Sequence, residues 1–532
     1  MNNMKITALY TLFLLSTLQI NAQKFEIIFQ QCYGGAVWEG ARTILPKNGG
    51  IVAFCSTSSN DGDVSYNYGK NDYWLIKTND IGEIVWEKTY GGSEQDYPAN
   101  MLPTTDEGFV MFGDTYSING DVGCNHGDGD WWLVKTDSLG NIQWSRCYGG
   151  THKETASQLI YAHEDGYVMT GKTGSVDGDI SHNNGMFDVW VVKVDWEGEI
   201  LWERTFGGSS NDWGNSIAPT ADGGYIVGGG GASSHDGNVC CPDAVASEWS
   251  TAWVIKLDGE GQIEWQNCYG GTESDIVADI IQTQDGSFIF LGAISSGDGD
   301  VDCFHGTPGD GSTNDMWVVK LDETGEIAWH RCLGGTGFDS PKLIRQMGDG
   351  GYLVGGNTTS RNGTVVCNES LPGTHTVILY KLSLEGEIEW TKCLGSQVDN
   401  SLLSMHLFSD YHFLLGATTR TWGMDVDCDL KGETDIWIVE IHDTTVGLHK
   451  EHLLQWQLFP NPGTTQTWLQ LPENTALAQA QIALYSPAGK LLYKAKPSSH
   501  FHKIDVAHLP KGLYLVRLWD GERWYVEKLV VR

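Results

Sequence analysis

The chain has 532 residues and carries 33 lysines and arginines against 68 aspartates and glutamates, a formal net charge of −35 at pH 7. This length exceeds what one ordinary hydrophobic core accommodates, so it predicts several cores or a closed array of repeats. The acidic balance excludes a nucleic-acid binder, which needs a basic stripe to meet phosphates, and disfavours electrostatic attachment to an anionic membrane.

The N-terminus has the pattern of a secretory signal peptide. Lys5 supplies the positive region, residues 6–20 form an apolar run, and Ile20-Asn21-Ala22 offers a cleavage site. The run is short for a membrane span, which takes about 20 residues. We therefore predict a signal peptide over residues 1–22, a mature protein beginning near Gln23, and no transmembrane segment after signal removal.

A pair of small residues, most often Gly-Gly, follows an aromatic residue or a leucine at seven places. The preceding residues are Tyr33, Tyr90, Tyr148, Phe206, Tyr269, Leu333 and Leu394, at successive separations of 57, 58, 58, 63, 64 and 61 residues. A near-constant period of this size indicates one supersecondary unit repeated along the chain.

Residues 96–150 show the content of one unit. Short β-rich runs at 98–102, 109–116, 130–136 and 142–148 are separated by tight turns and by one Gly/Asp-rich loop at 119–129. Four such runs per unit are typical of an antiparallel meander, and four-stranded sheets repeated radially form a β-propeller. Tryptophans recur in the third and fourth runs, as Trp132 and Trp144 do here, and are expected to pack between blades.

The number of runs predicts how the ring closes. Seven third strands are present but only six fourth strands follow them, and residues 25–33 match the missing pattern. The N-terminal strand is therefore expected to complete the last blade. The predicted fold class is all-β, a seven-bladed β-propeller of four-stranded blades over residues 23–442.

All 12 cysteines follow the signal peptide, which suits an oxidising compartment. Five directly precede the repeated triplet and five lie in the long loop two residues after a valine, and units that lack one lack both. This co-occurrence predicts the disulfides Cys124–Cys147, Cys241–Cys268, Cys303–Cys332, Cys367–Cys393 and Cys428–Cys32, the last of which closes the ring. Cys55 and Cys240 are left over, with Cys55 expected as a buried free thiol, and no Cys-x-x-Cys pair favours a metal site.

Two polar sets are expected on one face, formed by the Gly-Gly connections and by the long loops between second and third strands. The first set begins the innermost strands and is the candidate ligand-binding set at the mouth of the central channel: Glu39, Asp96, Glu154, Asp212, Asp275, Asp339 and Asp399. The second set is a loop motif: Asp61-Gly62-Asp63, Asn119-Gly120-Asp121, Asp177-Gly178-Asp179 and Asp298-Gly299-Asp300.

Both sets have a structural alternative. Capping of the connection is the favoured role of the first set. Oxygen-rich, Gly-turned loops hold Ca²⁺ in other proteins, but no loop here has the full spacing with a closing Glu. Asp and Gly are also the best turn formers, so turn formation is favoured over Ca²⁺, and no other cofactor is expected.

The sequence contains no recognised catalytic motif. Gly-x-Ser-x-Gly, His-Glu-x-x-His and a phosphate-cradling loop are all absent from it. Paired carboxylates alone leave a polysaccharide hydrolase or lyase open as an alternative, with Asp212 and Asp275 as the residues to test. The most divergent loop, 233–249, contains His235, Cys240 and Trp249 and is a candidate contact surface.

The repeats resemble those of secreted β-propeller proteins of the Bacteroidetes, through Tyr90-Gly91-Gly92, Asp96 and Asp130-Trp131-Trp132. After a linker at 443–456, residues 457–532 resemble the type A C-terminal sorting domain of the type IX secretion system. The motif positions that carry this resemblance are Phe459, Pro460, Asn461, Pro462, Gly489, Lys490, Gly512, Tyr514 and Lys528.

This second resemblance implies a small Ig-like β-sandwich recognised by the type IX secretion machinery of the outer membrane. It implies export through the periplasm and the outer membrane to the cell surface or the medium. An ordinary Ig-like binding module is the alternative for this segment.

Together these features favour an exported or cell-surface propeller that is non-enzymatic and binds an extracellular glycan or protein of unknown identity through the long-loop face. The alternatives are a polysaccharide-acting enzyme at the channel mouth and a structural surface protein rigidified by its disulfides. Propellers host many functions, so the fold alone does not choose among them.

Overall fold

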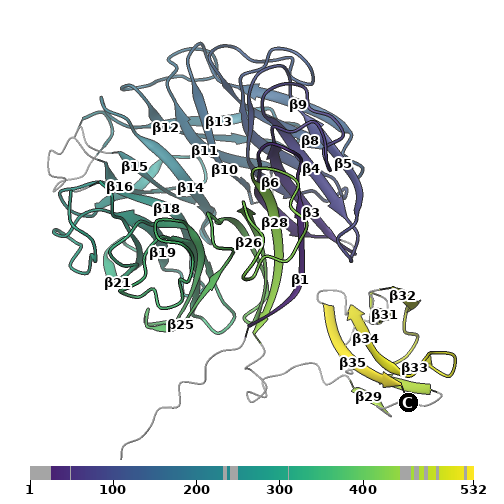
Figure 1. Cartoon of the computed structure of the whole chain (residues 1–532). Coiled ribbons are helices and arrows are strands. Elements are labelled where there is room, and N and C mark those ends of the chain that lie inside the picture. The colour runs from purple at the N-terminus through teal and green to yellow at the C-terminus, as the bar shows by residue number, and fades with distance from the viewer. Residues whose placement is uncertain are drawn as a thin grey trace, which may run out of the picture.

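The computed structural model describes residues 25–443, except 48, 164, 232–235, 240–249 and 310. In the C-terminal part it describes 457–459, 466–471, 477, 479–486, 490–519 and 524–531. The predicted signal peptide and residues 444–456 of the predicted linker lie outside the described residues. Every named element of the described residues is a β-strand (Figure 1).

Seven four-stranded antiparallel sheets, each a meander, form the blades of the propeller (Figure 1). Blade 1 contains β2 (Glu39–Pro46), β3 (Ile51–Thr57), β4 (Asp72–Thr78) and β5 (Ile84–Tyr90). Blade 2 contains β6 (Asp96–Pro103), β7 (Phe109–Thr115), β8 (Asp130–Thr136) and β9 (Ile142–Tyr148). Blade 3 contains β10 (Glu154–Tyr161), β11 (Tyr167–Thr173), β12 (Asp188–Val194) and β13 (Ile200–Phe206).

The next three blades repeat the same meander. Blade 4 contains β14 (Trp213–Pro219), β15 (Tyr225–Gly231), β16 (Thr251–Leu257) and β17 (Ile263–Tyr269). Blade 5 contains β18 (Asp275–Gln282), β19 (Phe288–Ile294), β20 (Asp315–Leu321) and β21 (Ile327–Leu333). Blade 6 contains β22 (Asp339–Gln346), β23 (Tyr352–Thr358), β24 (Thr376–Leu382) and β25 (Ile388–Leu394).

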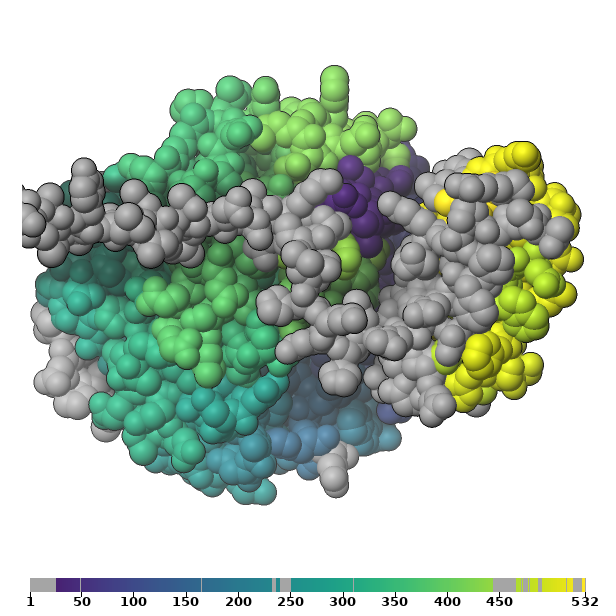
Figure 2. Space-filling view, turned by 90° about the horizontal axis from the view of Figure 1, so that it is seen from below, coloured from purple at the N-terminus to yellow at the C-terminus, as the bar shows by residue number. Residues whose placement is uncertain are grey.

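The last blade joins the two ends of the propeller sequence, as predicted. Blade 7 contains β26 (Ser401–Ser409), β27 (His412–Thr419), β28 (Asp435–Asp443) and the N-terminal β1 (Phe25–Tyr33). Phe25 of β1 lies opposite Asp443 of β28, and Tyr33 lies opposite Ile436. Figure 2 shows the purple N-terminal residues beside the light-green residues of this blade. The N-terminal strand therefore closes the ring by main-chain hydrogen bonding.

The third strand of each blade carries the side chain that anchors the core. Six of these strands place a tryptophan there with at most 1% of its surface exposed: Trp74, Trp132, Trp190, Trp253, Trp317 and Trp437. Ile378 takes the position in blade 6 and is fully buried as well. Each hydrophobic cluster joins residues of neighbouring blades, so the cores lie between the sheets. Truncating one such aromatic to alanine is expected to cost about 3–5 kcal/mol.

Four disulfides join the described cysteines, and they are four of the five pairs that the repeat alignment predicts. They are Cys32–Cys428, Cys124–Cys147, Cys303–Cys332 and Cys367–Cys393. The fifth predicted pair involves Cys241, which lies outside the described residues, as does Cys240. Cys55 is a buried free thiol.

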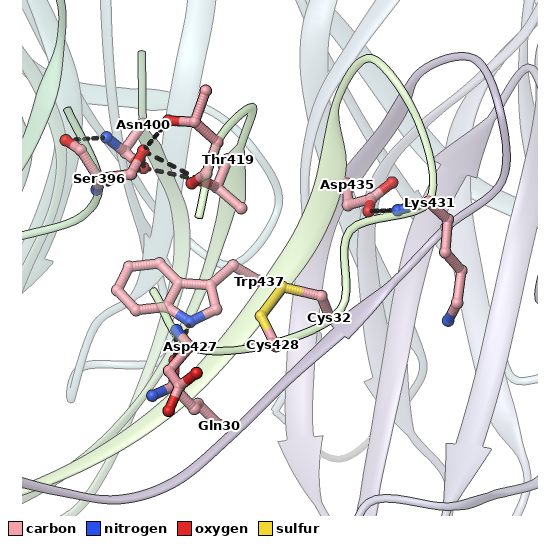
Figure 3. Close-up of a disulfide and its surroundings, with 12 residues drawn as sticks. Gln30, Cys32, Ser396, Asn400, Thr419, Asp427, Cys428, Lys431, Asp435 and Trp437 are labelled. Atoms are coloured by element: carbon pink, nitrogen blue, oxygen red, sulfur yellow. Dashed lines mark hydrogen bonds between the residues drawn. A yellow bond between two sulfur atoms is a disulfide. The ribbon is translucent and has the colours of Figure 1, made fainter. Parts of the chain in front are cut away.

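Figure 3 shows the disulfide between β1 and the loop before β28. Beside it, the Gln30 side-chain carbonyl accepts hydrogen bonds from the Asp427 backbone N–H and the Trp437 indole N–H, both at 3.0 Å. Strand β1 is thus held by main-chain hydrogen bonds to β28, by a disulfide and by side-chain hydrogen bonds.

The C-terminal part forms two antiparallel sheets. One contains β29 (Gln457–Phe459), β30 (Gln466–Gln470) and β33 (Phe501–Asp505). The other contains β32 (Leu491–Ala495), β31 (Gln481–Tyr485), β34 (Gly512–Trp519) and β35 (Trp524–Val531). Leu469 and Ile504 of the first sheet share one buried cluster with Ile482, Leu484 and Val516 of the second, which makes this unit a small β-sandwich.

Candidate functional site

The candidate functional surface is the long-loop face, which we define by the loops between the second and third strands of the blades and by the Gly-Gly connections. These loops span 58–71, 116–129, 174–187, 232–250, 295–314, 359–375 and 420–434. Most of the fourth loop, including the divergent segment with His235, Cys240 and Trp249, lies outside the described residues.

The acids that begin the innermost strands are buried beneath this face. Glu39, Asp96, Glu154, Asp212, Asp275 and Asp339 each have 0% of their surface exposed. In each blade the carboxylate accepts a hydrogen bond from the second Gly N–H of the preceding connection, at 2.8–3.1 Å. The Asp96 carboxylate also accepts from the hydroxyls of Thr115 (2.5 Å) and Ser117 (2.9 Å). These contacts give the acids a capping role and fix the connection to the next blade.

The seventh member of this set is Asn400, and the prediction of Asp399 was wrong by one residue. The Asn400 side-chain oxygen accepts from the Ser396 N–H at 3.1 Å and from the Thr419 hydroxyl at 2.9 Å (Figure 3). The cap lies four residues after the second small residue of the connection, and this spacing leads to Asn400. Asp399 instead has a φ of 21° and a side chain that is 39% exposed beside Arg420.

A second buried acidic set, which the sequence reasoning missed, begins the third strands of five blades: Asp72, Asp130, Asp188, Asp315 and Asp435. One oxygen of each accepts a backbone N–H of its own long loop, as Asp188 does from Asn184 at 2.8 Å. The other oxygen, Oδ1, is buried and has no described hydrogen-bond partner. The Asp-x-Trp pattern of the third strand was the sequence signal for this set.

The two sets meet at the first glycine of the connection. A Cβ built on Gly91 would lie 2.3 Å from Asp72 Oδ1 and 2.7 Å from Asp96 Oδ2, and the same arrangement recurs at Gly34, Gly149, Gly207 and Gly334. Burial, with the neighbouring Asp96 carboxylate as a smaller cause, raises the pKa of Asp72 to about 7. Burial likewise raises the pKa of Asp188, Asp315 and Asp435 to about 6.

The loop motif caps the same connections from the outside. Asp61 accepts from the Ala36 N–H at 2.7 Å, and Asp63 accepts from the Gly34 N–H at 3.1 Å. Neutral acceptors take these places in other blades, since Asn238 accepts from Gly207 N–H at 2.8 Å and Thr364 from Gly334 N–H at 2.8 Å. A position that takes Asp, Asn or Thr needs a hydrogen-bond acceptor more than a charge, which favours the turn-forming role.

Among the described residues, one group of three side chains lies close enough to hold a metal ion: Asp302, Cys303 and His330. Cys303 is joined to Cys332 in a disulfide, so it offers no thiolate to an ion.

The motif positions of the C-terminal unit are partly described. Phe459 ends β29, Gly512 begins β34 and Lys528 lies in β35, while residues 460–462 and Gly489 lie outside the described residues. The buried Tyr514 donates its hydroxyl hydrogen to the Pro510 carbonyl at 2.7 Å, and the Lys490 N–H donates to the Ser486 hydroxyl at 3.1 Å. These contacts hold the turns of the sandwich.

One curated protein is similar to part of the chain. The chain is 28% identical over 262 residues to the regulatory protein FlaEY of Caulobacter vibrioides, which covers 46% of this chain and 26% of FlaEY. The chain thus spans about a quarter of that relative's length.

Two solved structures are also similar. The extracellular domain of a hybrid two-component system from B. thetaiotaomicron has 9% identity and a TM-score of 0.39, over 93% of this chain and 55% of that one. PorZ, a surface component of the type IX secretion system of Porphyromonas gingivalis, has 7% identity and a TM-score of 0.26, over 95% of this chain and 100% of PorZ. These similarities assign no activity to the chain.

The C-terminal unit has a direct family match. Residues 457–532 match the family described as "Secretion system C-terminal sorting domain". No helix among the described residues is long and apolar enough to cross a membrane. The protein is therefore an all-β propeller followed by a type IX secretion C-terminal sorting domain, and it is exported to the cell surface or the extracellular space.

Proposed function

We propose that the exported chain is a non-enzymatic binding module that recognises an extracellular glycan or protein through the long-loop face. The observation that carries this proposal is the set of large apolar side chains exposed on that face: Val37, Tyr66, Tyr68, Ile118, Val176, Met186, Val366, Leu371, Trp422 and Met424. Trp422 is 77% exposed and Val366 81%. Function on a rigid scaffold is usually carried by its surface loops, and large exposed aromatic and apolar side chains on such loops are suited to recognition.

A shallow cavity on this face supports the proposal. It has a volume of about 220 Å³ and is lined by Thr336, Thr359, Arg361, Asn362 and Pro372, among others. Hydroxyl, amide and guanidinium groups in one concavity suit a polar ligand such as a sugar or a peptide backbone.

The acids support binding over catalysis. A polysaccharide hydrolase or lyase needs two carboxylates that reach the substrate. The six acids of the first set are fully buried and hydrogen-bonded to the connections between blades. This placement supports a role in holding the scaffold.

The test is a binding screen with the full exported chain on a glycan array and against envelope proteins. We expect selective binding that falls at least tenfold in Trp422→Ala or Arg361→Ala, with unchanged melting temperatures. The matched control is Leu139→Ala, which removes a 60% exposed side chain from a tight turn on the opposite face. Absence of any binding partner, or equal loss in the control, would contradict the proposal.

A further inference from the structure

The innermost strands of the seven blades contact one another around the propeller axis. All of them share a β-bulge at the same place, and β26 contains a second one further along. The extra residues of the shared bulge are Arg42, Ala99, Ser157, Asn215, Ala278, Lys342 and Leu403. All seven are partly exposed, although five of them lie between two buried neighbours. A bulge residue in the middle of an innermost strand that keeps solvent contact faces the axis, because the neighbouring blades cover its other sides.

Two of these seven residues are cations. Arg42 lies in blade 1 and Lys342 in blade 6, on either side of blade 7, whose bulge residue is Leu403. The other bulge residues are neutral, so the axis is asymmetric at this level. Burial lowers the pKa of both side chains, and the nearby Arg42 lowers that of Lys342 further.

Neither cation is paired within the described part of the chain. Arg42 and Lys342 form no hydrogen bond or ion pair with a described residue, and Arg42 Nε is buried without a partner. Burying an unpaired charge is costly, and proteins usually satisfy it with a counter-charge or hydrogen bonds. The two side chains therefore form a desolvated positive site in a protein of net charge −35.

The surrounding charges leave this site positive. Burial lowers the pKa of Arg42, and the carboxylate that opposes this shift is Asp114 of β7. Asp114 already accepts a hydrogen bond from the Ala156 N–H at 2.5 Å. Lys153 and Lys172 also interact electrostatically with the Asp114 carboxylate. Three cations, Arg42, Lys153 and Lys172, thus interact electrostatically with one hydrogen-bonded carboxylate, and an additional anion would be attracted to the axis.

Aromatic rings lie on the same strands nearer the long-loop face. Tyr97 and Trp213 each precede their bulge residue by two positions and are also partly exposed. The indole of Trp38 lies over Gly40, because a Cβ built on Gly40 would be 2.9 Å from the Trp38 ring. Flat amphipathic rings on the same side of the propeller as the long loops, together with two cations deeper along the strands, suit a sugar ring that carries an acidic group.

We propose that the propeller axis binds the carboxylate or sulfate group of an acidic saccharide between Arg42 and Lys342. This proposal deepens the proposed function and rests on it for the face from which the saccharide enters. The guanidinium fork of Arg42 binds the anion oxygens in two places, and Lys342 adds a point charge.

The test is calorimetric titration of the full exported chain with D-glucuronate, D-glucose and sodium sulfate at constant ionic strength. We expect saturable 1:1 binding of glucuronate, at least tenfold weaker binding of glucose, and loss of glucuronate binding in Arg42→Gln/Lys342→Gln. The matched control is Arg146→Gln, which removes an exposed cation paired with Glu199 on an outer strand and should bind normally.

Binding that persists in the double variant, or no glucuronate binding in the wild type, would overturn the proposal. Sulfate binding as tight as glucuronate binding would overturn its saccharide part. If uronates fail while neutral glycans or proteins still bind in a Trp422-dependent manner, the proposed function stands and this inference falls.

A second measurement separates a binding role from a structural one. Without ligand, Lys342→Met should leave the melting temperature unchanged or raise it, because it removes an unpaired, desolvated charge. A structural role predicts a lower melting temperature, and that result would also overturn the proposal.

Discussion

Cys32 and Cys428 are separated by 396 residues, yet their Cα atoms lie 5.5 Å apart and a disulfide joins them. The bond connects the first strand of the propeller to the loop before its last third strand, so it closes the ring covalently. The Cys124–Cys147 disulfide has the same position within its blade but spans only 23 residues.

Removing the ring-closing disulfide is expected to cost more than removing a local one. Chain-entropy arguments predict about 2.5 kcal/mol more for the 396-residue loop than for the 23-residue loop. Thermal and guanidinium unfolding of Cys32→Ser/Cys428→Ser and of Cys124→Ser/Cys147→Ser provides the measurement. Equal losses in the two double variants would show that β1 is held by its other contacts alone.

The paired carboxylates predict a pH-dependent stability. The pKa of Asp72 is about 7 in the folded chain against 3.8 ordinarily, so the folded state binds more protons between about pH 4 and 7. Its contribution is therefore full below pH 4 and is lost as the pH rises through 7. Asp188, Asp315 and Asp435 likewise contribute stability at low pH that is lost as the pH rises through about 6. Asp222 and Asp285 have pKa values lowered to about 2, so they titrate outside this window.

We expect the free energy of unfolding to fall between pH 5 and pH 8. Asp72→Asn should flatten this dependence and raise the melting temperature at pH 8, because an amide carries no charge to repel Asp96. The exposed turn variant Glu323→Gln is the matched control and should leave the pH profile unchanged. A pH-independent wild type would contradict the expected protonation.

The first glycine of the connection has no room for a side chain. Gly91→Ala would place a Cβ 2.3 Å from Asp72 Oδ1, so we expect a loss of about 1–3 kcal/mol. Gly123→Ala meets no atom within 4 Å and should stay within about 1 kcal/mol of the wild type. Denaturant midpoints of the two variants compare them directly, and a tolerated Gly91→Ala would mean that the carboxylates move apart easily.

Neighbouring blades are also joined by the tyrosine of the repeated triplet. The Tyr90 hydroxyl donates to the Gly140 carbonyl of blade 2 at 2.6 Å, and Tyr33, Tyr148 and Tyr269 repeat this bond. Tyr90→Phe leaves a buried acceptor unpaired and should lower the free energy of unfolding by about 1–2 kcal/mol. Tyr66→Phe, on an exposed loop residue, should have no measurable effect. An unchanged free energy of unfolding in Tyr90→Phe would indicate that water replaces the hydroxyl.

Much of the scaffold could be predicted from the sequence. The predicted third and fourth strands of blade 2 coincide with β8 and β9, and residues 25–33 form β1 as expected. The first strand starts at Asp96, two residues earlier than predicted, because the Asp96 N–H donates to the Asn71 carbonyl of blade 1 at 2.6 Å. A hydrogen bond to the preceding blade has no signature in the local sequence, so this strand start could not be predicted.

The sequence by itself determined the repeat, the tryptophan positions, the cysteine pairs and the closing strand, because each recurs at the period of the unit. Only the tertiary structure decided that Asn400 is the seventh cap, that Asp72 faces Asp96, and that Arg42 and Lys342 occupy equivalent bulges of the innermost strands. These relationships join different blades, so they depend on how the ring packs and on where each bulge falls. Periodicity along a chain records which positions are equivalent, whereas burial and unpaired charge depend on neighbours that only the closed ring brings together.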